Sequence, residues 1–393
     1  MRRALALALT GMLLVAGCSS AAPPPGETLI VVSAPLSTQP WIGRGIENGA
    51  RLAATQVTGA RSRVPVEVLD NGGSPQQAVA DAQRAVAQHA AALITDGTGA
   101  TAVAQVSEPA GLPVFVTFQG GASIVDPATR PTVFRIAPAN KPMSIRLADY
   151  LAGRHPRIGL LGDDSSYGRD GAAAMRSAFR RDLVPVVSDL TVPADAADLS
   201  AEVLAARRAG ATTLVLWCSA SDVAAAVQAA RSSGWQVPIY AGPTGEDPLV
   251  RQRLAAHPDW VNGLTFVSFR ITAEVGPAPF EQYRAAYEKR FGVERVGVRQ
   301  DGRDVVQPPD WSMFAYDAVR LVVAARAKGG SLLDALENTT ITGANGDERG
   351  FGPQQREGVS PDDMYFARFD RFVFAPVKDD ILSQGLPAVP QLR

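Results

Sequence analysis

Short apolar runs alternate with helical patterns along most of the chain. The runs are rich in Val, Ile and Leu and are nearly continuous, which is typical of strands buried on both faces. Because helical patterns lie between them, they predict parallel sheets covered on both faces, and two series of runs predict an α/β protein with two lobes of similar build. The first series is 28–34, 65–71, 91–95 and 113–118, and the second is 157–163, 184–192, 212–217 and 237–242.

Local signals mark several helix boundaries between these runs. Ser74 occupies an N-cap position, with Pro75 at the first helical position and Gln77 at the third, an arrangement typical of a helix start. Segments 198–210 and 221–234 each end in glycine, as helices commonly do. These signals place helices directly after and before predicted strands, as a βαβ architecture requires.

The N-terminus predicts export and a lipid anchor. Two arginines precede an apolar run over 4–16, which suits a secretory signal and is too short to cross a bilayer, where about 20 apolar residues are needed. The run ends in Val-Ala-Gly followed by Cys18, similar to the bacterial lipobox in which the cysteine is lipidated. We expect a signal peptide over 1–17, lipidation of Cys18 and a flexible tether over 18–27; the alternative is an ordinary secretory signal with a chance cysteine. The acyl chains would anchor the protein to the bacterial membrane on its extracytoplasmic side.

Composition narrows the partners that the protein can take. The chain of 393 residues has 38 basic and 39 acidic side chains and a formal net charge of −1. No basic patch is visible, so nucleic acid is not an expected partner. With Cys18 lipidated, Cys218 has no cysteine to pair with, and its place after the apolar run 212–217 favours a buried structural thiol over a nucleophile.

Small polar loops follow many of the predicted strands. In parallel α/β proteins, ligands bind beyond the C-terminal ends of the strands, where loops meet helix N-termini. The pattern therefore predicts a pocket for a small polar molecule. The loops are SAPLSTQPW (33–41), TDGTGAT (95–101), TFQGGAS (117–123), GDDSSYG (162–168), WCSAS (217–221) and AGPTGED (241–247).

The loop that begins at Gly97 fits the pattern G-x-G-x-x-A through residue 102. A dinucleotide fingerprint belongs to the first strand–helix unit and has an acidic residue about twenty positions further on, whereas this loop follows the third strand and 115–121 contains no acid. We therefore expect no nicotinamide cofactor. The N–H groups of this helix start, with the Thr98 and Thr101 hydroxyls, suit a carboxylate or another small acceptor; the alternative is a plain tight turn.

Signatures of catalysis are sparse in the sequence. Its three histidines lie within a predicted helix (His89) or directly before prolines (His155 and His257), and the chain has no H-E-x-x-H, G-x-S-x-G or C-x-x-C motif. The paired acids Asp163-Asp164 and Glu246-Asp247 are interpreted as solvated turns rather than metal ligands. We therefore expect neither an enzyme nor a bound metal.

Aromatic residues at strand ends are candidates for a small-molecule site. Trp41, Phe118 and Tyr167 each follow a predicted strand, and Trp311 precedes a helical segment. A few aromatic and polar groups together are typical of a ligand pocket. Burial of these rings in the core is the alternative.

Six segments, in order along 28–375, resemble the type I periplasmic solute-binding proteins of ABC transporters, and in particular the leucine/isoleucine/valine-binding group. No single segment is specific, but their order behind a lipobox is. The segments read SAPLSTQPWIGRGIENGARLA, DNGGSPQQAVADAQRAV, AGLPVFVTF, TVFRIAPAN, LLGDDSSYGRDGAAAM and FEQYRAAYEKRFG.

The resemblance implies a clamshell of two Rossmann-like lobes with parallel sheets, joined by a hinge of three crossings. Lobe 1 is expected over 28–135 and 269–350, and lobe 2 over 136–268 and 351–393. The crossings are expected near Phe134–Pro138, Gly263–Phe269 and Arg349–Pro353.

The resemblance also implies a ligand site at the strand ends of both lobes. In lobe 2, threonine stands at position 244, where amino-acid binders of the family have an acid for the ligand's ammonium; Glu246 or Asp247 are the nearby substitutes. The loop 296–311 also departs from the family's pattern. The implied ligand-binding residues are Trp41, Gly97, Thr98, Gly99, Thr101, Phe118, Gln119, Gly120 and Gly121 in lobe 1, and Tyr167, Ser219 (with the loop to Ser221) and Thr244 in lobe 2.

The function implied by the resemblance is extracytoplasmic capture of a small polar solute, such as a branched-chain or other amino acid or a related carboxylate or amide, for an ABC importer. The solute would dock on lobe 1, lobe 2 would close over it, and the transporter's permease subunits would be the protein partner of a monomeric binding protein. The alternatives are a ligand sensor for a receptor or regulatory partner and an exported α/β enzyme.

Overall fold

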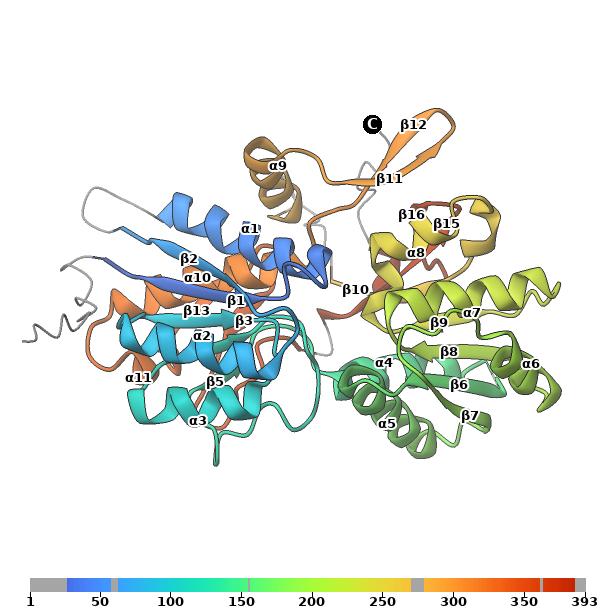
Figure 1. The fold of residues 1–393 in the computed structure, drawn as a ribbon, viewed down its shortest axis with the longest axis horizontal. Coiled ribbons are helices and arrows are strands. Elements are labelled where there is room, and N and C mark those ends of the chain that lie inside the picture. The colour runs from blue at the N-terminus through green and yellow to red at the C-terminus, as the bar shows by residue number, and fades with distance from the viewer. Residues whose placement is uncertain (1–26, 58–62, 155, 270–278, 361–362, 386–393) are drawn as a thin grey trace, which may run out of the picture.

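The computed structural model describes residues 27–57, 63–154, 156–269, 279–360 and 363–385. The predicted signal peptide, Cys18 and nearly all of the tether lie outside these residues. Two separate α/β units make up the described chain (Figure 1). We name the unit around the first sheet lobe 1 and the unit around the second sheet lobe 2.

Lobe 1 is built on a five-stranded parallel sheet in the order β2-β1-β3-β4-β5. Neighbouring residues of β1 point to opposite faces: Ile30 and Val32 enter one hydrophobic cluster with α1 and α10, and Val31 enters another with α2 and α3. Burial on both faces is the physical reason for the continuous apolar runs. The elements are β1 (Ile30–Ala34), α1 (Pro40–Val57), β2 (Val66–Asp70), α2 (Pro75–Ala87), β3 (Ala92–Thr95), α3 (Ala100–Ala110), β4 (Val114–Val116), β5 (Val133–Arg135) and α10 (Ser312–Arg326).

Lobe 2 is built on a seven-stranded sheet in the order β16-β15-β10-β9-β8-β6-β7. Strands β6 to β10 are parallel, which confirms the predicted fold class, but β15 and β16 run antiparallel at one edge. The elements are α4 (Asn140–Ala152), β6 (Ile158–Asp163), α5 (Ser166–Arg181), β7 (Val186–Val192), α6 (Ser200–Arg208), β8 (Thr213–Trp217), α7 (Ala220–Ser232), β9 (Ile239–Ala241), η1 (Pro243–Glu246), α8 (Pro248–Arg253), η2 (Pro258–Val261), β10 (Thr265–Ser268), β15 (Tyr365–Asp370), β16 (Val373–Pro376) and η4 (Leu382–Gly385).

Local signals in the sequence correspond to observed caps. The Ser74 side chain accepts a hydrogen bond from the Gln77 N–H at 3.3 Å and so caps α2 as predicted. Cys218 is a buried free thiol at the end of β8, which confirms its predicted structural place. Within the described ranges, no helix combines the length and the apolar character that a membrane span requires.

The packing differs from the predicted lobe boundaries in the segment after α9 (Pro279–Phe291). Strands β11 (Arg295–Gln300) and β12 (Arg303–Val306) form a hairpin that packs on α8 of lobe 2, although these residues fall in the range predicted for lobe 1 (Figure 1). Val296, Val298 and Val305 join the hydrophobic cluster of lobe 2 and explain this placement. The chain then returns to lobe 1, where α10, α11 (Leu332–Leu336), β13 (Thr340–Thr342) and β14 (Glu348–Gly350) follow.

A second difference concerns the segment after β14. Residues 351–358, predicted for lobe 2, lie against the first sheet: the Phe351 ring is 6.0 Å from that of Phe115 and 4.9 Å from that of Phe134, centroid to centroid. A parallel bridge joins Arg135 of β5 to Glu357. Aromatic packing on an edge strand therefore keeps this segment with lobe 1.

Replacing Glu294 with glutamine is expected to change how stability depends on pH. Glu294 lies between α9 and β11; burial raises the pKa of its carboxyl to about 7, Arg44 of α1 opposes this, and Asp310 and Asp247 add to it. The folded chain then binds more protons than the unfolded chain between about pH 4.5 and 7, so this carboxyl lowers the free energy of unfolding as pH rises through that window.

Urea unfolding at pH 5 and pH 8 measures the effect. From pH 5 to pH 8, the free energy of unfolding of Glu294→Gln should rise by about 1–3 kcal/mol relative to that of the parent. Glu348→Gln, at an exposed position of β14, is the matched control and should follow the parent. Parallel pH curves for the parent and Glu294→Gln would contradict this account.

Candidate functional site

The carboxyl ends of the parallel strands of the two lobes are turned toward one another (Figure 1). The two lobes come close together at Gly121, in the loop after β4 of lobe 1. A Cβ added to this glycine would collide with Oδ2 of Asp170 on α5 of lobe 2. The loops at these ends of the two sheets therefore meet at Gly121 and Asp170. This arrangement brings the sequence-predicted residues into two sets, one in each lobe.

The lobe 1 set is organised by the glycine-rich start of α3. Gly97 has φ 116° and Gly99 has φ 64°, conformations that favour glycine. A Cβ on Gly97 would lie 2.7 Å from Cβ of Gln119, so the loop after β3 packs directly on the loop after β4. Among the described residues, the N–H groups of Gly99 and Thr101 have no hydrogen-bond partner, and they are available to an acceptor at the positive end of α3.

Asp96, which the sequence reasoning missed, holds this set together. Its buried carboxylate accepts hydrogen bonds from Asn71 Nδ2 at 2.9 Å and from the Thr98 hydroxyl at 2.6 Å. It also accepts from the Thr98 N–H at 3.2 Å and from Gln119 Nε2 at 3.3 Å. Burial raises the pKa of Asp96, against these hydrogen bonds. The Thr98 hydroxyl and the Gln119 amide, both predicted to contact the solute, are thus engaged with Asp96.

The loop after β4 is fixed by Arg135 at the end of β5 and by the first residue of α4. Arg135 Nη1 donates to the Gly121 carbonyl at 2.7 Å and to the Gln119 carbonyl at 3.3 Å. Its remaining nitrogens pair with Glu357, with Nε at 2.7 Å from Oε2. The Gly120 carbonyl accepts from the N–H of Asn140, the first residue of α4. The predicted residues Gly120 and Gly121 are therefore held by segments that join the lobes.

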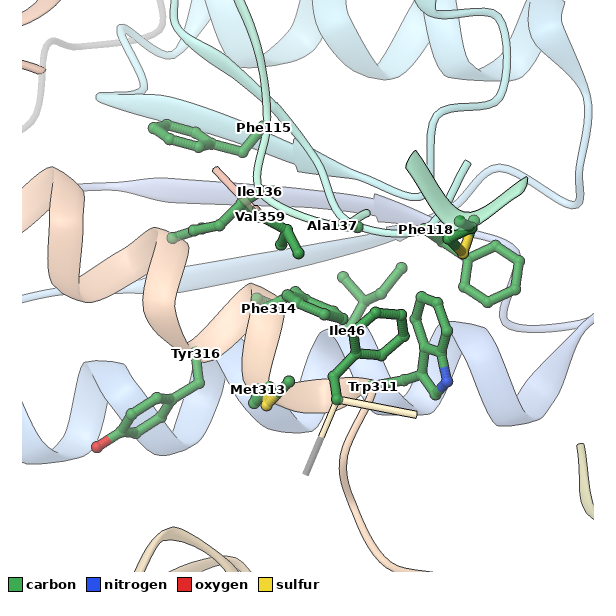
Figure 2. Close-up of a cluster of buried hydrophobic side chains, with 14 of the residues drawn as sticks. Ile46, Phe115, Phe118, Ile136, Ala137, Trp311, Met313, Phe314, Tyr316 and Val359 are labelled. Carbon is green, nitrogen blue, oxygen red and sulfur yellow. The ribbon is translucent and has the colours of Figure 1, made fainter. Parts of the chain in front are cut away.

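The predicted aromatic residues of lobe 1 are mostly part of the core. The Phe118 and Trp311 rings are 4.9 Å apart, and Trp311 is only 7% exposed (Figure 2). Trp311 also contacts Phe269 at 5.3 Å and Phe314 at 5.5 Å, centroid to centroid. This packing favours the alternative of core burial for Phe118 and Trp311. Trp41, at the start of α1, is partly buried against the same cluster.

The lobe 2 set is organised by Asp163 at the end of β6. Its Oδ2 accepts a hydrogen bond from the Ser219 N–H at 2.6 Å, and its Oδ1 accepts from the Ser165 N–H at 3.0 Å and from the Ser165 hydroxyl. Ser165 and Ser219 are the N-caps of α5 and α7. Asp163 is 1% exposed and thus aligns two helix starts from the interior, rather than forming the solvated turn that was predicted.

Tyr167 and Thr244 lie together beside these helix starts. The two hydroxyls are 3.4 Å apart, and the Thr244 hydroxyl donates to the Cys218 carbonyl at 2.6 Å. A Cβ on Gly242 would lie 2.7 Å from the Tyr167 hydroxyl, so the glycine makes room for the ring. Burial raises the pKa of Tyr167, which keeps the phenol protonated at neutral pH. Ser219 is less available, because its hydroxyl bonds Asp195 and Asp222 at 3.1 and 2.9 Å.

The acids proposed to substitute at position 244 have other partners. Glu246 is fully buried, and its Oε1 accepts from Gln307 Nε2 at 3.2 Å beneath the β11–β12 hairpin. Asp247 caps α8 by accepting from the Leu249 N–H at 2.8 Å. The expectation that the Glu246-Asp247 pair is a solvated turn is therefore wrong for Glu246.

Asp170 is the lobe 2 carboxylate that faces lobe 1. It is exposed and has no hydrogen bond or ion pair with another described residue. It lies three residues after Tyr167 on α5, so both side chains share one helix face. That spacing is a signal from which the sequence reasoning could have found it.

Other chemistry is limited in the part of the chain that the structure describes. It contains no group of three or more His, Cys, Asp or Glu side chains placed to hold a metal ion. Two cavities, of about 330 and 400 Å³, are lined by other residues and lie away from the loops described above. The two loop sets thus offer N–H and hydroxyl groups and one free carboxylate, which suits reversible binding of a small polar molecule.

Comparisons with known proteins agree with this arrangement. A curated relative, the Leu/Ile/Val-binding protein homolog 7 of Brucella melitensis, is 24% identical over 270 residues, which cover 64% of this chain and 67% of the relative. A branched-chain amino acid transporter substrate-binding protein of Streptococcus pneumoniae, solved with isoleucine, has a TM-score of 0.74 at 18% identity and covers 88% of this chain and 97% of its own.

A second solved structure extends the range of bound molecules among similar folds. It is an ABC transporter solute-binding protein of Rhodopseudomonas palustris, solved with 3,4-dihydroxybenzoic acid, with a TM-score of 0.72 at 19% identity and coverage of 89% and 95% of the two chains. Residues 30–372 of the present chain match the family described as periplasmic binding protein. The chain therefore belongs to the periplasmic binding protein family and is a solute-binding protein related to the Leu/Ile/Val-binding proteins.

Proposed function

We propose that this protein is a lipid-anchored, extracytoplasmic component of an ABC importer that traps a small carboxylate-bearing solute between its lobes. The observation that carries the proposal is the meeting of Gly121 with Asp170, which sets the strand-end loops of the two sheets opposite one another. Membrane attachment through Cys18 and handover to permease subunits complete the proposal. A Cys18→Ala variant released from the membrane fraction would support the anchor.

The solute docks first on lobe 1 in this mechanism. Its carboxylate accepts hydrogen bonds from the N–H groups of Gly99 and Thr101 at the positive end of α3. Closure of lobe 2 then adds the Tyr167 hydroxyl and the Thr244 loop. Only the closed form makes both sets of contacts, so the solute shifts an equilibrium between open and closed arrangements, and the transporter reads the closed one.

The bound molecules of the two similar structures, isoleucine and 3,4-dihydroxybenzoic acid, both carry a carboxylate. They differ in the ammonium group, which only the amino acid has. In this chain Asp170 is the group that supports binding of an ammonium, because it is an exposed carboxylate without a partner among the described residues and faces lobe 1. We propose an amino acid as the solute, with Asp170 in the role that threonine at position 244 cannot fill.

Native mass spectrometry of the freshly purified mature protein tests the proposed function. A retained molecule with a carboxylate group, confirmed by calorimetry with the pure compound, is the expected result. Calorimetry against a panel of amino acids and small carboxylates extends the search if the solute is lost on purification. Absence of binding to every member of the panel, together with an unliganded mass, would contradict the proposal.

Asp170→Asn tests the role of the carboxylate. The variant should bind the amino acid about 10–100-fold more weakly, because a charged hydrogen bond contributes about 1.5–3 kcal/mol. Binding of the matching 2-oxo acid, which has no ammonium, should change less than threefold. Asp164→Asn, at an exposed position two residues before the start of α5, is the matched control. Equal losses for the two ligands would exclude Asp170 as the ammonium partner.

A further inference from the structure

A polar cavity of about 330 Å³ lies in lobe 2 at the edge of the sheet opposite the solute site. Its wall includes Val237 and Pro238, which precede β9, and Asn262 and Gly263, which precede β10. The C-terminal end of β9 leads into the Thr244 loop of the proposed solute site, so the cavity belongs to the other end of the sheet. Nothing in the proposed import mechanism uses it.

Positive charge is in excess on the cavity wall. Three arginines (Arg154, Arg231 and Arg368) and one acid (Asp379) line it. Arg154 is neutralised, because its Nη2 is 2.7 Å from Asp379 Oδ2. Neither Arg231 nor Arg368 has an ion pair with a described residue.

Arg231 is the most constrained of these cations. It is 8% exposed, and its Nη1 donates to the carbonyls of Trp235 and Val237, both at 2.9 Å. These neutral acceptors orient the guanidinium without compensating its charge. Burying a cation without a counterion is costly, and an anion in the adjoining cavity would reduce that cost.

Arg368 supplies a second guanidinium from β15. In the antiparallel pairing of β15 with β10, Arg368 lies opposite Thr265, the first residue of β10. Arg368 is exposed and lines the cavity. Tyr150 and Tyr240 line the same space, with their ring centroids 6.0 Å apart. The Tyr150 hydroxyl donates a hydrogen bond to Asp379 Oδ1 at 3.2 Å. The two guanidinium groups form a donor set that matches a tetrahedral oxyanion.

We propose that this cavity binds a phosphate-type oxyanion through Arg231 and Arg368, at a site separate from the solute site. The volume accommodates inorganic phosphate, and the phosphate group of an anionic lipid or a small phosphate ester has the same chemistry. Asp379 does not oppose binding, because Arg154 compensates its charge. Occupancy stabilises the folded chain by mass action.

Thermal unfolding of the purified mature protein with inorganic phosphate, at constant ionic strength in chloride, tests the proposal. The melting temperature should rise by about 2–4 °C and saturate as phosphate exceeds its dissociation constant. Arg368→Gln, at an exposed position, should weaken phosphate binding at least tenfold. Arg231→Lys should weaken it as well. Arg371→Gln, which lies outside the cavity and pairs with Asp301, is the control and should bind phosphate normally.

Further arms separate the sources of the oxyanion. Sedimentation that is greater with phosphatidylglycerol than with phosphatidylcholine vesicles, and whose excess is lost in Arg368→Gln, would identify a lipid headgroup as the ligand if inorganic phosphate has no effect; the neutral vesicles account for binding through the acyl chains on Cys18. The proposal would be overturned if the rise in melting temperature with phosphate persisted in Arg368→Gln, disappeared in Tyr167→Phe or was reproduced by chloride. Absence of both phosphate binding and vesicle binding would also overturn it. Tyr167 belongs to the proposed solute site, so that variant separates this inference from the import proposal.

Discussion

Replacing Arg135 with methionine is expected to lower the free energy of unfolding by about 3 kcal/mol, because it removes a buried guanidinium and leaves the half-buried Glu357 carboxylate and two loop carbonyls without their donor. Arg135 is 2% exposed and pairs with Glu357, while its Nη1 donates to the carbonyls of Gln119 and Gly121. Methionine fills much of the volume but donates no hydrogen bond. Urea unfolding followed by circular dichroism measures the loss.

The same substitution should weaken solute binding, because Arg135 holds the loop that carries Gly120 and Gly121. Glu357→Gln is the variant to compare with it, because glutamine removes the negative charge but keeps a hydrogen-bond acceptor. It should lower the free energy of unfolding by less than Arg135→Met does. The Glu357 side chain is about one third exposed, at 32%, so water replaces part of its interaction. An unfolding curve for Arg135→Met that overlaps that of the parent would show that this contact does not stabilise the hinge.

Asp163→Ala is expected to lower the free energy of unfolding by about 2–4 kcal/mol and to reduce the affinity for the solute by at least tenfold. The substitution leaves the N–H groups of Ser165 and Ser219 without their acceptor at the starts of α5 and α7. Tyr167 lies in the first turn of α5, so the disturbance reaches the proposed solute site directly. Chemical unfolding and calorimetry with the identified solute measure the two effects.

Asp164→Asn provides the contrast for that result. Asp164 is the next residue and is exposed, and its carboxylate accepts a hydrogen bond from the Ala194 N–H at 2.9 Å. Its replacement should change stability by less than about 0.5 kcal/mol. Equal effects of the two substitutions would contradict the organising role assigned to Asp163.

Features with a local physical cause could be predicted from the sequence. The strands that are buried on both faces, such as Ile30–Ala34, appear as continuous apolar runs, and the Ser74 cap depends on neighbouring residues only. The hairpin over 295–306 also had a local signal that was not used: Asp301-Gly302, both with positive φ, is a favoured two-residue hairpin turn. Its packing on lobe 2 depends on distant partners and could not be predicted in the same way.

The candidate site shows the same division. The glycine-rich start of α3 could be predicted from its residues, whereas the role of Asp96 as the common acceptor of Asn71, Thr98 and Gln119 required the three loops to be brought together. Burial of Glu246 beneath Gln307 is likewise a tertiary effect across 61 positions. The role of a side chain in such a network depends on the residues that it contacts. Those contacts join distant parts of the chain and cannot be identified from a single sequence.

The central claim is that two opposed lobes close on a small solute, and small-angle X-ray scattering of the mature protein tests it most directly. Profiles are recorded with and without a saturating amount of the solute identified by mass spectrometry. We predict a smaller radius of gyration and a shorter maximum dimension on binding, with Asp170→Asn requiring more amino acid to reach the same change. Stoichiometric binding that leaves the scattering profile unchanged would contradict closure of the lobes.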